Sequence, residues 1–248
     1  MLEKLPDVVG HALRGQRAGL DKIAYQAVDL RAGMASLAVT SLAFTEAYHH
    51  ASTFNRLPGW RLITGSATRK DPATGRLVGR DVAILVRRWR KNLENGVLRA
   101  SLASTPIRIA PERYIVWTVD EMHGRPLAHV SVHPNAVVSS QKDWDSDRGE
   151  KYRDAMGALY DTVVRLRKTY GKSLDVVVTG DLQYRRTDDD RPGSPRDIFR
   201  RLNLNWTVTG IDWMAHSDGL RLVDTVIIPP EVNGQDHPWI EGTFEQIV

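Results

Sequence analysis

The stretch Leu174–Gln183, LDVVVTGDLQ, limits the possible folds of this chain more than any other segment. Its apolar run is rich in β-branched valines on both faces, which is typical of a central strand that is covered on two sides. Gly180 then lets the backbone turn where a side chain would crowd a ligand. Asp181 and Gln183 follow on alternate positions, so an extended backbone presents both side chains on one face. Such an Asp can also serve only to shape a turn.

A long amphipathic helix precedes this strand. Its apolar residues recur at helical spacing and form one stripe, namely Tyr152, Met156, Leu159, Val163, Leu166 and Tyr170. Gly171 is placed to cap its C-terminus. The segment Leu127–His133, LAHVSVH, predicts a strand before the helix, so strand, helix and strand form a parallel crossover unit. Because parallel neighbours end at the same sheet edge, we expect His133 and Asp181 to lie together.

Other segments predict further elements. We expect an amphipathic helix over residues 19–35. Strands are expected within residues 37–44, 60–64, 82–88, 114–119, 207–215, 221–230 and 239–248. The polar residues 139–150 predict a loop, and the Pro- and charge-rich residues 184–200 predict a surface loop that could fold over a substrate.

Composition excludes several classes of protein. The 248 residues show no internal repeat or linker and predict a single domain spanning residues 1–248. The absence of cysteine excludes thiolate chemistry, Cys-ligated zinc and disulfides, so any metal must be held by oxygen or imidazole. The apolar residues 37–44 are too few to span a bilayer, and a signal peptide is not evident. We therefore expect a cytoplasmic protein without a membrane partner, with a monomer as the default.

Basic residues give a weak indication of a polyanionic partner. The 34 Lys and Arg residues exceed the 30 Asp and Glu residues, for a net charge of +4, which also fits an ordinary solvated surface. A basic cluster surrounds Trp89 and consists of Arg87, Arg88, Arg90 and Lys91. This cluster could bind the substrate by following a phosphate backbone. It also fits a strand edge whose charges discourage unwanted pairing.

Polar side chains end several of the predicted strands. They are Glu46, His133, Asp181 with Gln183, Asp212, and the neighbours Asp236 and His237. In α/β sheets the ligand crevice lies where strand ends and their loops converge. Separated carboxylates suit Mg²⁺ or Mn²⁺, which take oxygen ligands. An Asp beside a His orients the imidazole, which can then donate to a phosphoryl oxygen or move a proton.

These residues lie in six short motifs, AFTEAY, GRDVAILVRR, LAHVSVHP, VVVTGDLQ, GIDWMA and QDHPWIEGTFE. Their order and approximate spacing resemble the endonuclease/exonuclease/phosphatase superfamily, which includes deoxyribonuclease I-like nucleases, apurinic endonucleases, inositol polyphosphate 5-phosphatases and sphingomyelinases. The motifs cover most of the chain after residue 20. The resemblance implies a four-layer α/β sandwich, in which two packed mixed β-sheets are flanked by helices and the active site lies at one end.

The resemblance also implies roles for the acidic residues. Glu46 would hold the metal, and Asp236 would share in the metal site and orient His237. Asp181 would align or deprotonate the attacking water. Asp212 would occupy the second acid position beside the site.

The remaining polar residues would contact the phosphoryl group. His133 and His237 would stabilise charge on that group or on the leaving oxygen. Gln183 would contact the phosphate or the nucleophile, although the family motif GDxN has Asn there, and the extra methylene of Gln would carry the amide past a site built for Asn. The family's first strand carries an Asn, whereas VVGHALRG offers only His11.

The sequence thus predicts a Mg²⁺-dependent hydrolase that cleaves phosphodiester bonds of nucleic acid, with DNA as the expected substrate, by in-line attack of water. Two alternatives stay open. One is a phosphatase or phosphodiesterase that acts on a small molecule or lipid headgroup, because the fold does not settle the substrate. The other is a catalytically silent protein that binds nucleic acid or a protein.

Overall fold

The structure is a computed structural model, and it describes residues 41–45, 58–64, 69–70, 77–78, 82–101, 113–122, 124–135, 140–228 and 239–247. Its first strands are β1 (Ser41–Thr45), β2 (Trp60–Thr64), β3 (Arg69–Lys70), β4 (Leu77–Val78), β5 (Val82–Arg87), β6 (Lys91–Ser101), β7 (Arg113–Met122) and β8 (Arg125–Val132). They are followed by α4 (Gln141–Trp144), α5 (Asp147–Tyr170), η1 (Gly171–Ser173), β9 (Asp175–Asp181), α6 (Pro195–Arg201), β10 (Leu204–Thr209), β11 (Asp212–Ser217), β12 (Leu220–Ile228) and β13 (Trp239–Gln246).

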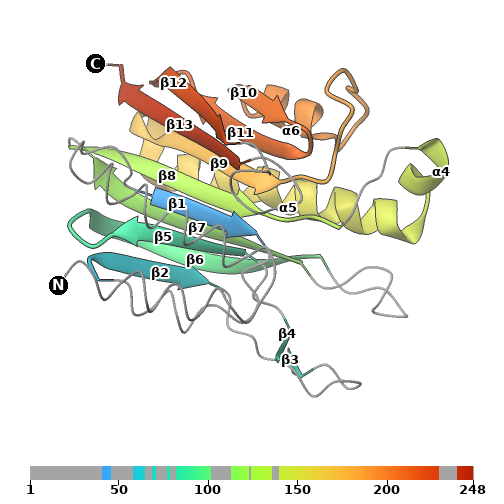
Figure 1. Cartoon of the computed structure of the whole chain (residues 1–248), viewed down its shortest axis with the longest axis horizontal. Helices are drawn as coiled ribbons and strands as arrows, with labels where there is room; N and C mark the ends of the chain where they lie inside the picture. Colours follow the sequence, from blue (N-terminus) through green and yellow to red (C-terminus); the bar gives the residue numbers. More distant parts are fainter. Residues whose placement is uncertain are drawn as a thin grey trace.

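A six-stranded sheet forms the centre of the molecule, with the order β10-β11-β9-β8-β7-β6 (Figure 1). Within it, β8 and β9 are parallel, and Val130 of β8 is paired with Val178 of β9. Helix α5 joins these two strands, which confirms the predicted crossover unit. Since both strands run in the same direction, the segments that follow them emerge at the same edge of the sheet.

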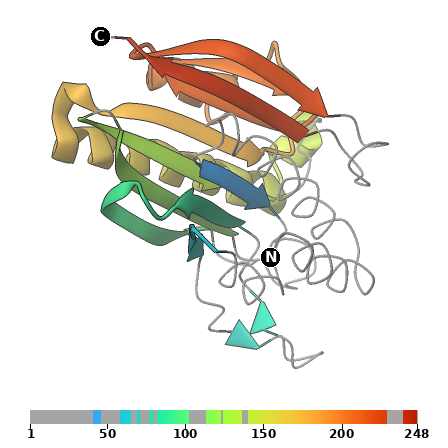
Figure 2. The ribbon, with the colours of Figure 1, turned by 60° about the vertical axis from the view of Figure 1, so that its left-hand side comes forward.

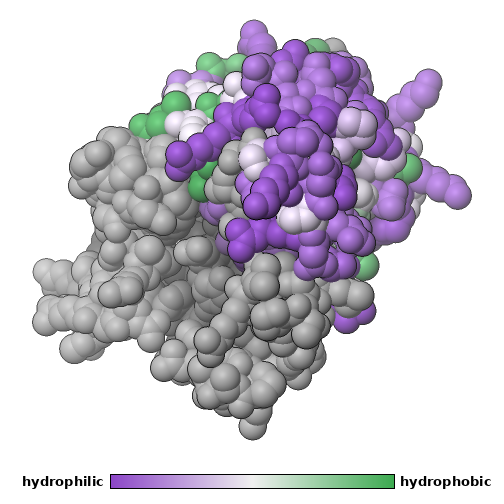
Figure 3. Space-filling view, turned by 90° about the vertical axis from the view of Figure 1, so that its right-hand side faces the viewer, coloured by the Kyte–Doolittle hydropathy of each residue, from purple (hydrophilic) through white to green (hydrophobic). Residues whose placement is uncertain are grey.

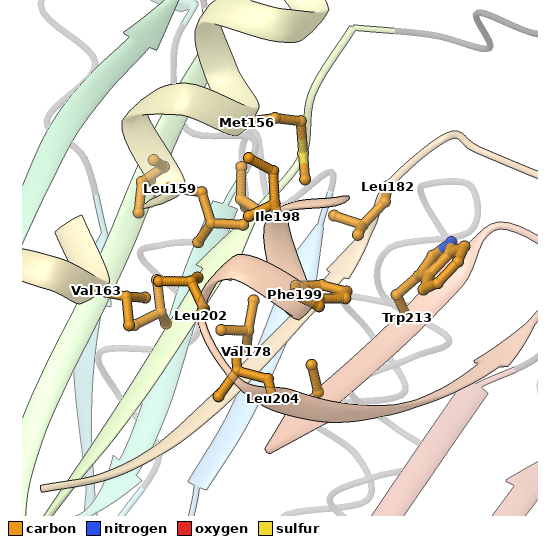
Figure 4. Close-up of a cluster of buried hydrophobic side chains, with 14 of the residues drawn as sticks. Met156, Leu159, Val163, Val178, Leu182, Ile198, Phe199, Leu202, Leu204 and Trp213 are labelled. Carbon is orange, nitrogen blue, oxygen red and sulfur yellow. The ribbon is translucent and has the colours of Figure 1, made fainter. Parts of the chain in front are cut away.

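Helices α5 and α6 cover one face of this sheet. The predicted stripe of α5 is buried from Tyr152 to Leu166, against the inward side chains of β8 and β9. Figure 4 shows Met156, Leu159 and Val163 of α5 gathered with α6 residues around Val178. Burying one such aliphatic side chain is worth about 1.5–3 kcal/mol, so the apolar stripe decides which face of the helix turns inward. Gly171 ends the helix with a φ of 74°, as predicted.

Two smaller antiparallel sheets cover the other face (Figure 2). The sheet β1-β5-β2 packs Ile63, Val82, Ile84 and Val86 against Val116 of β7. The β12-β13 pair packs against β8, β9 and β11 through Leu127, Val177, Met214 and Leu220. The strands predicted within residues 60–64 and 82–88 are β2 and β5, and they pair with each other in antiparallel orientation. The α/β sandwich is therefore confirmed as well, while the helix predicted over residues 19–35 lies outside the described residues.

Two predicted loops are wrong in part. Residues 139–150 contain α4 and the start of α5, because Ser140 and Ser146 each accept a backbone N–H and thereby cap the two helices. Residues 184–200 contain most of α6, whose N-cap is Ser194 and whose first residue is Pro195. Their polar composition indicated loops, but Ser and Pro are also the residues that begin helices.

Strand β6 was not among the predicted elements. Its sequence KNLENGVLRAS is polar, and from Lys91 to Val97 it alternates between exposed and partly buried positions. This alternation is typical of a strand at the edge of a sheet, where one face stays wet. Among the helices in the described ranges, none combines the length and apolar character required to cross a bilayer.

Candidate active site

A close approach of β9 to β8 forms the base of the candidate site. A Cβ atom added to Gly180 would lie 2.1 Å from the carbonyl oxygen of Val132, so only glycine lets the two backbones pass at this distance. The close packing of β9 against β8 thus explains why a glycine stands at position 180, near the end of β9. The approach brings the next residue, Asp181, beside the residue that follows β8, His133.

His133 and Asp181 form the centre of the candidate site. Nε2 of His133 lies 3.8 Å from Oδ2 of Asp181, and both side chains are almost fully buried. The predicted meeting of these two residues at one sheet edge is confirmed. This edge faces the viewer in Figure 3, where the described surface is mostly hydrophilic.

Gln183 does not extend past the site but folds back onto Asp181. Its backbone has a φ of 53°, in the left-handed region that residues other than glycine seldom adopt. Its backbone N–H donates to Oδ1 of Asp181 across 3.0 Å, and its side-chain Nε2 donates to Oδ2 across 2.6 Å. The Asp181 carboxylate is therefore held at both oxygens by a single residue.

The turn between Asp181 and Gln183 is fixed from two sides. The hydroxyl of Tyr152 on α5 donates to the carbonyl of Leu182 across 3.0 Å. Burial raises the pKa of this phenol well above its ordinary value, and Tyr184 and Asp181 raise it further, so the hydroxyl remains a donor. The N–H of Leu182 donates to the carbonyl of Ile211, next to β11. These contacts hold the turn that carries Asp181.

Two buried residues that sequence reasoning missed, Arg113 and Asn135, belong to the same hydrogen-bond network as His133. Arg113, the first residue of β7, places Nη1 3.1 Å from Nδ1 of His133. Its Nε donates to Oδ1 of Asn135 across 3.0 Å. Asn135 stands two residues after His133, and this short spacing could have indicated Asn135 as a further residue of the site. Arg113 is 20 residues away in sequence and gave no such signal.

Asp212 lies opposite Asp181. It begins β11, and the two residues are paired across the antiparallel ladder. Paired residues in a ladder point to the same face of the sheet. The structure therefore places the predicted second acid next to Asp181, and its role stays a prediction.

The predicted metal ligands Glu46 and Asp236, together with His237, lie outside the described residues. In the described ranges, no three His, Asp or Glu side chains come together to form a metal site. The polar side chains at this edge nevertheless include the carboxylates of Asp181 and Asp212, and the chain has no thiol. Oxygen donors without sulfur fit Mg²⁺ or Mn²⁺.

The basic cluster lies at the other end of the sheet. Lys91 begins β6 and is paired with Glu121 of β7, which is in turn paired with Pro126 near the start of β8. His133, by contrast, follows the end of β8. The eight residues of β8 span about 25 Å, so this separation keeps the cluster away from Asp181.

The side chains of the cluster also have partners within the fold. Arg87 stacks over the ring of Trp60 at 4.2 Å, and Arg90 is buried. Arg88 donates to the carbonyl of Trp60, and Lys91 is 2.9 Å from a carboxylate oxygen of Glu121. The structure therefore does not bring the cluster to the candidate site.

A pocket of about 360 Å³ also lies at that far end of the strands. Arg125 and Asp175 line it, and Arg125 is 3.2 Å from Oδ2 of Asp175. Burial raises the pKa of Asp175, against the opposing effects of Arg125, Gln246 and Ser217. The pocket is separated from His133 by the length of the sheet.

Comparison with known proteins identifies the fold. No family model and no curated protein matches the sequence. Among solved structures, the endonuclease/exonuclease/phosphatase from Bacteroides vulgatus is similar, with a TM-score of 0.63, 15% identity, and coverage of 92% of this chain and 90% of that one. A mannosyl-6-phosphatase from Bacteroides thetaiotaomicron gives 0.60 and 15%, over 88% of this chain and 89% of that one.

A third structure, TDP2 from D. rerio complexed with a single-strand DNA product, gives a TM-score of 0.57 and 14% identity, over 89% of this chain and 91% of that one. At such identities the likeness concerns the fold. It confirms the resemblance stated from the six motifs, at the level of the fold. The chain has the deoxyribonuclease I-like fold of the endonuclease/exonuclease/phosphatase proteins.

Proposed function

We propose that this protein is a divalent-metal-dependent phosphodiesterase that hydrolyses nucleic acid. The observation that carries the proposal is the meeting of His133 and Asp181 at 3.8 Å, at the edge where parallel strands end. A carboxylate and an imidazole at such an edge can act as the base and the hydrogen-bond donor in the hydrolysis of a phosphoester. Both are held by neighbours that do not depend on a ligand.

The proposed division of labour follows from the contacts. Asp181 is held at both oxygens by Gln183 and would align the attacking water or accept its proton. His133 would donate to a phosphoryl oxygen. His237 would act on the same group, with Asp236 to orient it. A Mg²⁺ or Mn²⁺ ion held by Glu46 and Asp236 would supply positive charge to offset the charge that develops on the phosphoryl group.

Nucleic acid is the proposed substrate for two reasons. Arg185 is exposed, lies two residues beyond Gln183, and forms no ion pair or hydrogen bond with the described residues. An arginine of this kind next to the site suits a phosphate backbone. The similarly folded TDP2 was solved with a single-strand DNA product.

A phosphatase that acts on a small molecule is the second candidate. The mannosyl-6-phosphatase has the same fold over 88% of this chain, and that fold serves both kinds of substrate. The weak excess of positive charge does not decide between them.

Cleavage of supercoiled plasmid tests the proposal. We expect nicking in Mg²⁺ or Mn²⁺, loss of nicking in EDTA, and a loss of roughly 10²- to 10⁴-fold in Asp181→Asn, because the amide cannot accept the proton of water. Asp188→Asn makes the same change on an exposed neighbouring loop residue and should keep full activity. Nicking that survives in Asp181→Asn would contradict the proposal. Turnover of p-nitrophenyl phosphoesters without plasmid cleavage would favour the small-molecule enzyme.

A further inference from the structure

Arg113 joins two side chains of the segment that follows β8. Its Nη1 is 3.1 Å from Nδ1 of His133, and its Nε is 3.0 Å from Oδ1 of Asn135. All three side chains are buried, and Arg113 enters from the start of β7. The guanidinium is planar and rigid, so two donors of one group fix the spacing of His133 and Asn135.

The chemistry of the guanidinium decides which nitrogen of His133 carries the proton. Arginine has five N–H donors and no acceptor. Nδ1 of His133 must therefore act as the acceptor in this contact, and the proton of the neutral imidazole resides on Nε2. Nε2 is also the atom that faces Asp181, at 3.8 Å from Oδ2. The N–H of His133 thus points to the edge where a phosphoryl group would bind.

The same argument fixes the amide of Asn135. Because Arg113 donates to its oxygen, the oxygen faces Arg113 and the NH₂ group faces away. Asn135 is fully buried, and its Nδ2 has no hydrogen-bond partner among the residues that the structure describes. A buried donor without a partner destabilises the folded state, so an oriented and unsatisfied NH₂ group requires an explanation. A ligand oxygen would satisfy it.

We propose that Arg113 is a positioning residue, which fixes the Nε2–H tautomer of His133 and turns the NH₂ group of Asn135 away from itself, so that both present donors to a phosphoryl oxygen. The chemical purpose of this arrangement rests on the proposed function, whereas the tautomer does not. Arg113 acts through its two neighbours. Partners that orient a reacting group in this way typically contribute roughly 10- to 100-fold in activity.

Long-range ¹H–¹⁵N correlation spectra of the full-length protein, without metal or substrate, test the tautomer directly. The chain has eight histidines, so His133→Gln is needed to assign the signal by its disappearance. We expect Nδ1 of His133 to resonate as an unprotonated nitrogen and Nε2 as a protonated one. A protonated Nδ1 in the unmodified protein would overturn the proposal, and this measurement needs no variant of Arg113.

Variants then test whether Arg113 is responsible. Arg113→Met removes every donor to Nδ1, so the single Nε2–H signature should give way to a mixture of the two tautomers, whereas Arg113→Lys keeps a side chain that only donates and should retain the single signature. Arg125→Met removes an arginine at the far end of β8 and should leave His133 unchanged. An unchanged signature in Arg113→Met would contradict the role given to Arg113. If Arg113→Met does not fold, loss of the signature in Arg113→Lys contradicts it equally.

Activity separates this inference from the proposed function. In plasmid nicking, Arg113→Met should lower kcat by roughly 10- to 100-fold with a smaller effect on KM, because no contact to the substrate is removed. A protein with the Nε2–H tautomer but without cleavage would contradict the proposed function alone. A cleaving protein with the proton on Nδ1 would contradict this inference alone.

Discussion

The side-chain amide of Gln183 donates to Oδ2 of Asp181 across 2.6 Å, while the backbone N–H of the same residue holds Oδ1. The sequence suggested that the longer side chain of Gln183 would extend past the site. It instead turns back and contacts the carboxylate of Asp181. The left-handed backbone of Gln183, with a φ of 53°, is what makes this possible. One residue therefore both turns the backbone after the strand and orients the acid.

Gln183→Asn should retain or raise activity. Asn adopts the left-handed region more readily than Gln, so the turn is preserved. Its shorter amide can no longer fold back in the same way and leaves Oδ2 of Asp181 accessible to water. Initial rates of plasmid nicking, compared with those of Asp181→Asn, measure the effect. A loss as large as that of Asp181→Asn would show that the site is built around the longer amide.

Gly180→Ala should destabilise the protein and lower its activity together. The new Cβ would meet the carbonyl oxygen of Val132 at 2.1 Å, and because that atom is backbone, β8 and β9 must separate. Overpacking of this kind costs about 1–3 kcal/mol and would move His133 away from Asp181.

Gly157→Ala is the matched control for this change. Gly157 lies within α5 and has no atom within 4 Å of an added Cβ, so the same substitution should stabilise the protein by about 0.5–1 kcal/mol. Chemical denaturation of both variants measures the two signs. Equal stability of the two would contradict the account of the β8–β9 contact.

Acidification should destabilise the protein through His129. Burial, together with the smaller effect of the nearby Arg90 cation, lowers the pKa of this imidazole to about 3. Its two nitrogens contact the hydroxyls of Ser41 and Thr179 between the sheets. The folded state therefore keeps His129 neutral while the unfolded state binds a proton below pH 6.5.

The sign follows from linkage. The contribution of neutral His129 to the free energy of unfolding is fully present above pH 6.5. It falls as the pH decreases towards 3, by about 1.4 kcal/mol per pH unit for this one proton. Urea denaturation at several pH values measures the slope, and His129→Gln should remove this part of it. A slope in His129→Gln as steep as that of the unmodified protein would show that other groups cause the acid sensitivity.

Tyr184→Phe should loosen the segment between β9 and α6. The hydroxyl of Tyr184 donates to Oδ2 of Asp189 across 2.5 Å, and Asp189 also accepts from the backbone N–H of Arg191. Burial tends to raise the pKa of Asp189, yet the hydrogen bonds from Tyr184 and Arg191 lower it overall. Removal of one donor to this buried carboxylate should cost about 1–3 kcal/mol.

Tyr160→Phe provides the control for this variant. Arg201 stacks over the Tyr160 ring at 4.2 Å, and the ring survives the change, so stability should stay within about 0.5 kcal/mol. Chemical denaturation and limited proteolysis of residues 184–194 report the difference. Equal resistance of the two variants to protease would argue against Tyr184 as an anchor.

The sequence was sufficient for the crossover unit and for the meeting of His133 and Asp181. Helical spacing from Tyr152 to Tyr170 and the apolar runs on either side are local patterns, which depend on neighbouring residues along the chain. Parallel pairing then places the two strand ends at one edge whatever the side chains do afterwards. Local sequence patterns therefore determined that the site lies at the edge where β8 and β9 end.

Tertiary structure decided how the side chains at that edge are held. Arg113 reaches His133 from a different strand, and the basic cluster from Arg87 to Lys91 lies at the opposite end of the sheet, where Trp60 and Glu121 contact it. The turn that leads to Gln183 is held at Leu182 by contacts from Tyr152 of α5 and from Ile211, which precedes β11. These partners are set by the packing of several elements at once, and no spacing along the chain encodes them.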